Sequence, residues 1–181
     1  MARVPPPRDY ARRVDFPDAV TLRPIGVVRS PHVERHGTPR QATVPADPEL
    51  RPDERARVEL FADAAPEASL RDLDGFDYVW VIAWLHLNEG WRPTVVPPRG
   101  PRLARGLFAT RAPHRPNPLA LSSARILALE PSAVVFERLD LLDGTPVLDL
   151  KPYVPAADAH PNARAGWVDA IGDTIPPSNT S

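Results

Sequence analysis

Residues 108–122 read FATRAPHRPNPLALS, a stretch that carries two arginines, a histidine and an asparagine between apolar residues. The prolines at 113, 116 and 118 fix φ and push each preceding residue into extended geometry, so no helix is expected across 112–118. Rigid loops that carry arginine, histidine and asparagine are typical of sites for anionic or nucleotide-like ligands. A proline-rich surface connection with scattered charges is the alternative, and the residues of this loop alone favour neither interpretation.

The composition is that of one globular domain. At 181 residues with 43% hydrophobic content, the chain is long enough to bury a sizeable core. The absence of cysteine excludes disulfides, thiolate metal sites and a cysteine nucleophile. The longest apolar run, residues 78–85, is far shorter than the ~20 residues needed to span a bilayer, and residues 1–17 carry acids and prolines instead of an apolar signal core. We therefore expect a soluble, cytoplasmic protein without a membrane partner.

The overall charge says less about partners. The net charge is −1, whereas nucleic-acid-binding domains often show a basic excess. Lys151 is the sole lysine of the sequence, so the other permanently charged basic residues are arginines, which bind phosphate through paired hydrogen bonds and stack on bases. A local basic patch is compatible with this composition, although a GC-rich genome also produces abundant arginine, alanine and proline. We attribute most of the arginines to that bias.

Short strands separated by proline and glycine dominate the pattern. The most hydrophobic segment, residues 76–88, is rich in β-branched and aromatic residues and predicts a buried strand. Asp143 and Gly144 predict a type I′ turn that pairs residues 132–142 with the segment after the turn. Further strands are expected over 20–28, 56–61, 105–111 and 121–130, with loops at 44–55 and 91–106.

This pattern predicts a mainly β fold, namely a small single-domain β-barrel with one or two short helices, long proline-rich loops and no Rossmann architecture. A short helix is expected over 66–73 and is ended by Gly75, because glycine accepts the positive φ of a helix stop. We expect a flexible arm at 1–17, the barrel domain at 18–158 and a tail at 159–181. The candidate anchors of the tail are Gly166, Trp167, Val168 and Ile171.

Two groups of polar side chains are candidate sites. His86 and Asn88 end the most hydrophobic segment and, in a strand, point to the same side, either as a ligand rim or as groups that satisfy loop backbone. Asp140, Asp143 and Asp149 suggest a metal or acid–base cluster. For Asp143 a turn is the favoured interpretation, because Asp-Gly is typical of type I′ turns.

The loop TRAPHRPNPLALS resembles the T-R-S-P-x-R-P-N-P-[IL]-G-L-S signature of the TrmO (TsaA-like) family. The blocks HGTPRQ at 36–41, WLHLN at 84–88 and LDLLDGTPVLDLKPYVP at 139–155 are similar to further blocks of that family, in the same order. The resemblance covers residues 21–158. It implies a small β-barrel that uses S-adenosyl-L-methionine as co-substrate, without a metal, to methylate N6 of threonylcarbamoyladenosine in the tRNA anticodon loop, at position 37. It also implies a homodimer.

The resemblance also implies a set of site residues. Arg40 or Arg111 would hold the donor carboxylate by a bidentate contact. Arg115 and Asn117, on the lip of the loop, would grip the acceptor, and together with Asp143 they are the candidate catalytic residues. The residues implied to contact S-adenosyl-L-methionine are Pro39, Arg40, Gln41, His86, Leu87, Asn88, Arg111, Leu121, Leu141, Leu142, Asp143, Gly144 and Thr145.

The chain departs from the family pattern at two positions. Ala120 replaces the usual glycine, which restricts backbone approach to a ligand, and Ala112 replaces the usual serine, which removes a hydroxyl. We also expect this chain to lack the additional C-terminal domain that some bacterial members carry. Donor binding therefore follows more directly from the resemblance than the tRNA acceptor does.

Two catalytic signatures are absent from the sequence. No Gly-x-Gly occurs, so a nucleoside donor would have to bind outside the common Rossmann-type methyltransferase fold. No Gly-x-Ser-x-Gly occurs either, which weakens a hydrolase interpretation in which Ser122 or Ser123 pairs with His114 and an aspartate.

Three functions therefore stay open on the sequence. The first is a tRNA-modifying methyltransferase, which surface arginines around the 108–118 loop would favour. The second is a methyltransferase for a small-molecule acceptor in a specialised pathway, which an enclosed apolar pocket would favour. The third is a non-catalytic module that binds S-adenosyl-L-methionine.

Overall fold

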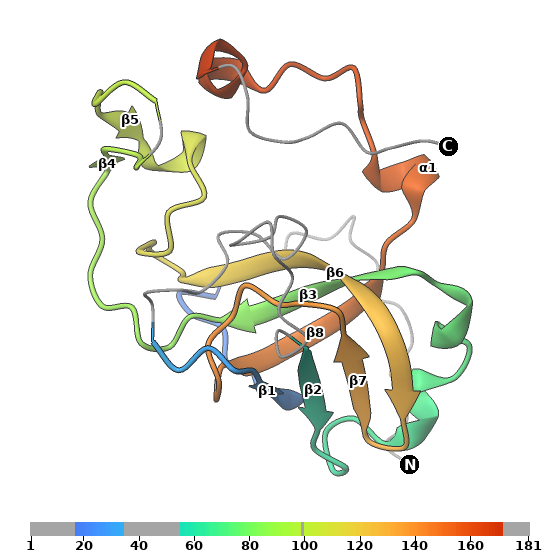
Figure 1. The fold of residues 1–181 in the computed structure, drawn as a ribbon. Helices are drawn as coiled ribbons and strands as arrows, with labels where there is room; N and C mark the ends of the chain where they lie inside the picture. The colour runs from blue at the N-terminus through green and yellow to red at the C-terminus, as the bar shows by residue number, and fades with distance from the viewer. Residues whose placement is uncertain (1–16, 35–54, 99, 172–181) are drawn as a thin grey trace, which may run out of the picture.

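Six antiparallel strands close into a barrel in the order β1-β2-β7-β6-β3-β8 (Figure 1). The computed structural model describes residues 17–34, 55–98 and 100–171. The strands are β1 (Gly26–Arg29), β2 (Ala56–Leu60), β3 (Tyr78–Trp84), β6 (Leu119–Glu130), β7 (Ala133–Phe136) and β8 (Pro146–Pro152). This architecture confirms the small, mainly β barrel that the short strand pattern predicts.

The barrel interior is filled by β-branched and aromatic side chains. Along β3, Val79, Val81 and Ala83 are fully buried while the residues between them are only partly covered. This alternation follows from the period of two in a strand, because successive side chains point to opposite faces. The other fully buried large side chains are Val28, Val58, Val134, Phe136, Leu139 and Val147.

Gly26 permits the close approach of β1 to β2 on one side of the barrel. A Cβ atom at this position would lie 2.4 Å from the carbonyl oxygen of Glu59, which is backbone and cannot turn away. Only glycine fits such an approach without moving a strand.

The predicted hairpin between residues 132–142 and 145–154 is wrong. β7 pairs with β2 and β6, whereas β8 pairs with β1 and β3. Residues 137–145 instead cross the rim of the barrel between the two strands. Asp143 and Gly144 do form a turn, closed by the Thr145 amide donating to the Leu142 carbonyl, but only Gly144 has a positive φ (75°), and a type I′ turn needs two.

Several predicted elements are shorter than expected. The strand over 20–28 is reduced to β1, and residues 105–111 form only β5 (Arg105–Gly106) followed by a 3₁₀ helix, Leu107–Ala109. The predicted strand over 76–88 ends at Trp84, so His86 and Asn88 lie in a turn and the period-two argument for them fails.

The expected helix over 66–73 consists of two 3₁₀ turns, Glu67–Leu70 and Leu73–Gly75. The predicted positive φ at Gly75 is wrong, because the left-handed residue is Asp72, with φ of 65°. The single α-helical turn of the described chain is α1 (Pro155–Asp158), and no helix in the described ranges has the length and apolarity to cross a bilayer.

A small hairpin projects from the barrel beside the 108–118 loop, which we call the signature loop. It consists of β4 (Thr94–Val95) and β5, and the 3₁₀ helix Gly166–Ile171 of the tail lies on the same side of β6 (Figure 1). Trp167 donates from Nε1 to the Ala109 carbonyl at 2.7 Å, and its ring lies 5.2 Å from the Arg105 guanidinium carbon. The side chain of Ile171 contacts Gly100. Trp167 and Ile171 are therefore anchors of the tail, as predicted.

Candidate functional site

One end of the barrel collects most of the residues that the sequence singles out. Because neighbouring strands are antiparallel, this end carries the last residues of β1, β7 and β3 and the first residues of β2, β6 and β8. The 108–118 loop leads into β6, residues 85–90 follow β3, and residues 137–145 lead into β8. These three connections and the residues after β1 form what we call the rim.

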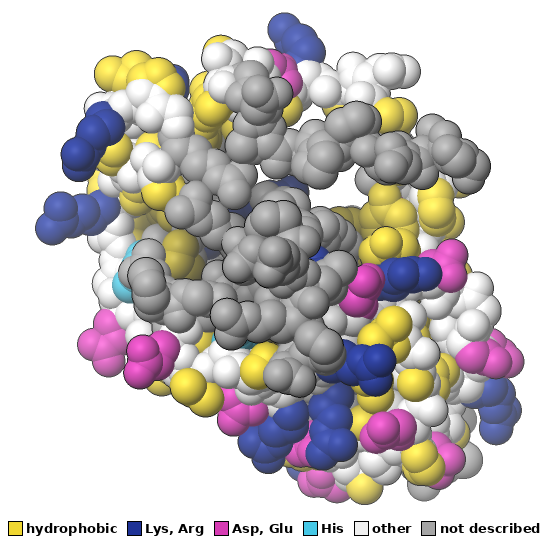
Figure 2. Space-filling view, viewed as in Figure 1, with side chains coloured by type: hydrophobic (Ala, Val, Ile, Leu, Met, Phe, Trp, Pro, Cys, Tyr) yellow, Lys and Arg dark blue, Asp and Glu magenta, His cyan; other side chains and the backbone are white. Residues whose placement is uncertain are grey.

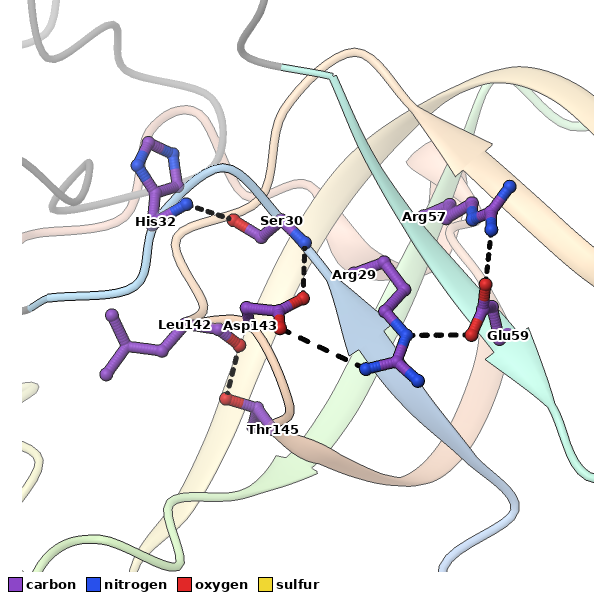
Figure 3. Close-up of polar contacts among 8 residues, drawn as sticks. All are labelled: Arg29, Ser30, His32, Arg57, Glu59, Leu142, Asp143 and Thr145. Carbon is purple, nitrogen blue, oxygen red and sulfur yellow. Dashed lines mark hydrogen bonds and ion pairs between the residues drawn. The ribbon is translucent and has the colours of Figure 1, made fainter.

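The turn Leu142–Thr145 is fixed to the end of β1 by several hydrogen bonds (Figure 3). The Asp143 amide donates to the His32 carbonyl at 2.7 Å, and the Asp143 Oδ1 accepts from the Ser30 amide at 3.1 Å. The Gly144 amide donates to the Val28 carbonyl at 2.9 Å. Within the turn, the Thr145 hydroxyl donates to the Leu142 carbonyl at 2.7 Å. The turn therefore keeps one conformation with the Asp143 carboxylate partly exposed at the surface.

Beside this turn, β1 and β2 carry a chain of alternating charges (Figures 2 and 3). Arg29 donates from Nε to Glu59 Oε2 at 2.8 Å and lies 3.9 Å from Asp143 Oδ2, while Arg57 donates to the other oxygen of Glu59. The hydrogen bond from Arg29 lowers the pKa of Glu59, and Glu59 in turn raises the pKa of Arg29. An open groove of about 440 Å³ lies here, lined in part by Arg29, Arg55, Arg57 and Asp143. Sequence reasoning missed these arginines, since none lies in a recognisable motif.

A part-buried hydrogen bond joins β6 to the 137–145 connection. Ser122 is buried and donates from Oγ to Asp140 Oδ1 at 2.6 Å. Burial is the main cause that raises the pKa of Asp140 above its ordinary value, whereas the hydrogen bond from Ser122 and the charge of Arg111 act in the opposite direction. Both partners adjoin residues assigned to the donor site, namely Leu121 and Leu141. Ser122 and Asp140 were noted in the sequence only as possible members of other clusters.

The signature loop is held together by its own side chains. Arg115 donates from Nη1 to the carbonyl oxygens of Thr110 at 3.0 Å and Ala112 at 3.4 Å, and its guanidinium lies 5.5 Å from the Phe108 ring. Thr110 donates from its hydroxyl to the Leu107 carbonyl at 2.8 Å. In this arrangement Arg115 braces the loop from within.

The connection after β3 lies against the signature loop. The Leu85 amide donates to the Pro118 carbonyl at 2.8 Å, and His114 Nδ1 lies 3.2 Å from the Glu89 carbonyl oxygen. Asn88 donates from its side chain to the Leu85 carbonyl at 3.3 Å. His86, half-buried, packs its ring 5.9 Å from that of Trp84.

The structure thus brings the predicted site residues into two groups. His86, Leu87 and Asn88 lie against the loop that carries Arg111, Arg115 and Asn117, while Leu141–Thr145 lie against the end of β1. The Ser122–Asp140 hydrogen bond connects the two groups through β6. Arg111 and Asn117 are exposed, Leu121 is 60% exposed and Leu141 is buried. Pro39, Arg40 and Gln41, the 44–54 part of the predicted loop and residues 1–16 of the predicted arm lie outside the described residues.

Two alternatives from the sequence lack support in this geometry. Asp149 pairs with Lys151 at 2.6 Å instead of joining Asp140 and Asp143, and no cluster of three metal-ligating residues occurs among residues 17–34, 55–98 and 100–171. Ser122 donates directly to Asp140 with no histidine between them, so a serine–histidine–aspartate triad is not assembled here.

The chain is similar in sequence and structure to known proteins over most of its length. Residues 27–159 match the family model described as the tRNA-methyltransferase O N-terminal domain. A tRNA (adenine(37)-N6)-methyltransferase from Escherichia coli K12 is 37% identical over 153 residues, covering 81% of this chain and 63% of that protein. A probable S-adenosyl-L-methionine-binding protein from Pyrococcus abyssi is 37% identical over 85% of this chain and 79% of its own length.

Among solved structures, the crystal structure of TrmO from Pseudomonas aeruginosa superimposes with a TM-score of 0.65 at 36% identity. The match covers 82% of this chain and 62% of that one. The chain therefore spans less than two thirds of the length of both the Escherichia coli and the Pseudomonas proteins.

Proposed function

This chain belongs to the family of the tRNA-methyltransferase O N-terminal domain, and we propose that it is an S-adenosyl-L-methionine-dependent methyltransferase that methylates an adenine N6 in tRNA. The finer proposal is that the acceptor is threonylcarbamoyladenosine at position 37. The observation that carries the proposal is the Ser122–Asp140 hydrogen bond at the rim, which joins β6, the strand that follows the signature loop, to the connection that contains the fixed turn Leu142–Thr145.

The residues at this junction match the chemistry of the donor, which is a nucleoside joined to an amino acid. Leu121 offers an exposed apolar side chain for an adenine ring, and Asp143 offers a partly exposed carboxylate that can accept from ribose hydroxyls. Arg111 offers an exposed guanidinium, which suits the carboxylate of the methionine end. We propose that the backbone of Leu141, Leu142, Gly144 and Thr145 lines the nucleoside and that His86, Leu87 and Asn88 close the other side. Pro39, Arg40 and Gln41 complete the proposed donor set.

The sulfonium of the bound donor supplies a methyl group for an in-line displacement, so the protein has to orient the reactants. Asn117, exposed on the loop, has an amide that can donate to and accept from an acceptor base. Arg115 keeps the loop in shape through its bonds to Thr110 and Ala112, and we propose that this fixes the position of Asn117 relative to Asp143.

An open rim favours a large acceptor over a small one. The groove at the rim is open, and the loop residues Phe108, Arg111 and Asn117 are exposed. A small-molecule methyltransferase would instead enclose its acceptor in a largely apolar cavity. The Pyrococcus relative carries the name of a binding protein, so binding of the donor without transfer remains the second candidate function.

We further propose that the chain acts in the cytoplasm as a homodimer. On the outer faces of β3 and β6, Trp84 pairs with Leu119, and both side chains are exposed apolar groups. Such a surface on a small barrel suits a second copy of the chain.

Calorimetric titration with S-adenosyl-L-methionine tests the donor site. We expect saturable binding at one site per chain, weakened by Asp143→Ala and Arg111→Ala. The variant Asp149→Asn, which removes a paired surface carboxylate on β8, serves as the control and should bind the donor as the unmodified chain does. No binding by the unmodified chain would contradict the proposed function.

A further inference from the structure

The segment from residue 91 to residue 118 differs from the rest of the chain in charge. It contains six arginines and neither aspartate nor glutamate, in a protein whose net charge is −1. We call this segment the arginine lobe; it comprises the β4–β5 hairpin, the 3₁₀ helix Leu107–Ala109 and the signature loop. Figure 2 shows Lys and Arg side chains, and no Asp or Glu side chain, on the visible surface over β4 and β5.

Two arginines of the lobe are available to an external partner. Arg92 and Arg102 are exposed, and none of the ion pairs in the described part of the chain includes them. On the barrel, in contrast, Arg29, Arg57 and Arg125 all have carboxylate partners. Folding therefore pairs Arg29, Arg57 and Arg125 with carboxylates, whereas Arg92 and Arg102 have no carboxylate partner among the described residues.

The lobe also presents aromatic side chains to solvent. Phe108 is 80% exposed and Trp91 is 52% exposed, although burying such side chains is normally favourable. The backbone around Phe108 is fixed, because Leu107 is buried, Thr110 bonds back to Leu107 and Trp167 donates to Ala109. The Arg115 guanidinium lies 5.5 Å from the Phe108 ring. A rigidly held, exposed ring beside an arginine is an arrangement on which unpaired nucleobases stack.

We propose that the arginine lobe is the surface on which the chain binds the RNA acceptor, with Arg92 and Arg102 contacting phosphates and Phe108 stacking on an unpaired base of the anticodon loop. This inference rests on the proposed function and extends it by assigning the RNA contact to residues outside the donor site. Charge decides the choice of partner, because a second copy of the chain would bring the same positive lobe or a barrel of mixed charge, whereas RNA is a polyanion.

The test measures RNA affinity of the full chain by fluorescence anisotropy with a labelled anticodon stem-loop RNA across a series of salt concentrations. Arg92→Ala/Arg102→Ala should weaken binding and reduce the slope of log affinity against log salt by about 1.4 to 1.8, since each of the two phosphate contacts contributes about 0.7 to 0.9. The control Arg71→Ala/Arg125→Ala removes two arginines outside the lobe and should leave the slope unchanged.

Phe108→Ala should weaken binding roughly 5- to 150-fold with an unchanged salt slope, and Phe108→Trp should restore it, because stacking depends on a ring and not on charge. All variants should bind S-adenosyl-L-methionine as the unmodified chain does. The inference would be overturned if the lobe variants left RNA binding unaffected, or if the unmodified chain bound the donor but no RNA. Neither result would contradict donor binding by the chain. Variants that change the oligomeric state and not RNA affinity would also overturn it, in favour of a second copy. Failure of the unmodified chain to bind the donor would instead contradict the proposed function.

Discussion

Ser122 donates a 2.6 Å hydrogen bond to Asp140, and the two residues adjoin Leu121 and Leu141 in the sequence. One partner lies in β6 and the other in the connection between β7 and β8, so a single part-buried bond connects two parts of the proposed donor site. The bond is therefore placed to affect both the stability of the barrel end and the shape of the site.

Removing the donor of this bond should destabilise the fold. We expect Ser122→Ala to lower the free energy of unfolding by about 1.5 to 3 kcal/mol, because the Asp140 carboxyl then loses its hydroxyl partner inside the protein. Urea denaturation measures this change. Ser123→Ala, at the next position, is the control and should change stability by no more than about 0.5 kcal/mol. Equal effects of the two variants would contradict the importance of the bond.

The stability of the chain should depend on pH through Asp140. Burial raises the folded-state pKa of Asp140 above its ordinary value of 3.8, so the folded state favours the protonated form. The resulting stabilisation is complete below the unfolded-state pKa and is lost as the pH rises through the folded-state pKa. Asp140→Asn should flatten this part of the profile, as measured by urea midpoints at a series of pH values. A profile identical to that of the unmodified chain would contradict the assignment.

The same group offers a direct spectroscopic check. Because the hydrogen bond from Ser122 lowers the pKa of Asp140, Ser122→Ala should raise that pKa further. Titration of the carboxyl carbon by NMR measures the pKa in both proteins. An unchanged or lower pKa in the variant would show that Ser122 does not stabilise the carboxylate.

Replacing Gly144 in the Leu142–Thr145 turn should lower both the stability of the chain and its affinity for the donor. Gly144 has a φ of 75°, so Gly144→Ala should cost about 1 to 2 kcal/mol of stability and weaken S-adenosyl-L-methionine binding. Gly166, with a φ of 63° in the tail, provides a matched control. Gly166→Ala should lose a similar amount of stability without loss of donor affinity. Calorimetry that finds the same donor affinity for both variants would contradict the placement of the turn in the site.

The tail should restrict the motion of the arginine lobe through Trp167. Trp167→Phe removes the hydrogen bond to the Ala109 carbonyl, and we expect faster amide exchange over residues 100–111 in hydrogen–deuterium exchange. Trp80→Phe is the control, because it removes a comparable bond, from Nε1 to Asp158 at 3.1 Å, away from the lobe. Equal exchange over 100–111 in both variants would contradict an anchoring role.

The sequence was sufficient for the barrel where local pattern and tertiary packing agree. The residues at 56–61 and 121–130 predict strands, and the structure contains β2 and β6 at these places. The Asp143-Gly144 signal failed as a hairpin predictor because turn chemistry is local, whereas the partners of β7 and β8 are chosen by closure of the barrel. His86 and Asn88 were misplaced for a related reason, since apolar composition does not mark where β3 leaves the sheet.

For the candidate site, sequence patterns located the segments and not the contacts. The prolines of 108–118 and the family resemblance pointed to segments that the structure gathers at one end of the barrel. Neither could reveal that Arg115 bonds to its own loop, which depends on the folded path of the backbone. The Ser122–Asp140 bond joins residues 18 positions apart and depends on the pairing register of β6. A local sequence motif therefore cannot predict it.

Methyl transfer to tRNA tests the central claim most directly. The full chain is incubated with S-adenosyl-L-methionine and tRNA that carries threonylcarbamoyladenosine. The tRNA is then digested to nucleosides, whose masses are measured by mass spectrometry. We predict a threonylcarbamoyladenosine heavier by one methyl group, formed by the unmodified chain and strongly reduced in Asp143→Ala. Bound donor with every tRNA nucleoside unchanged in mass would contradict the account.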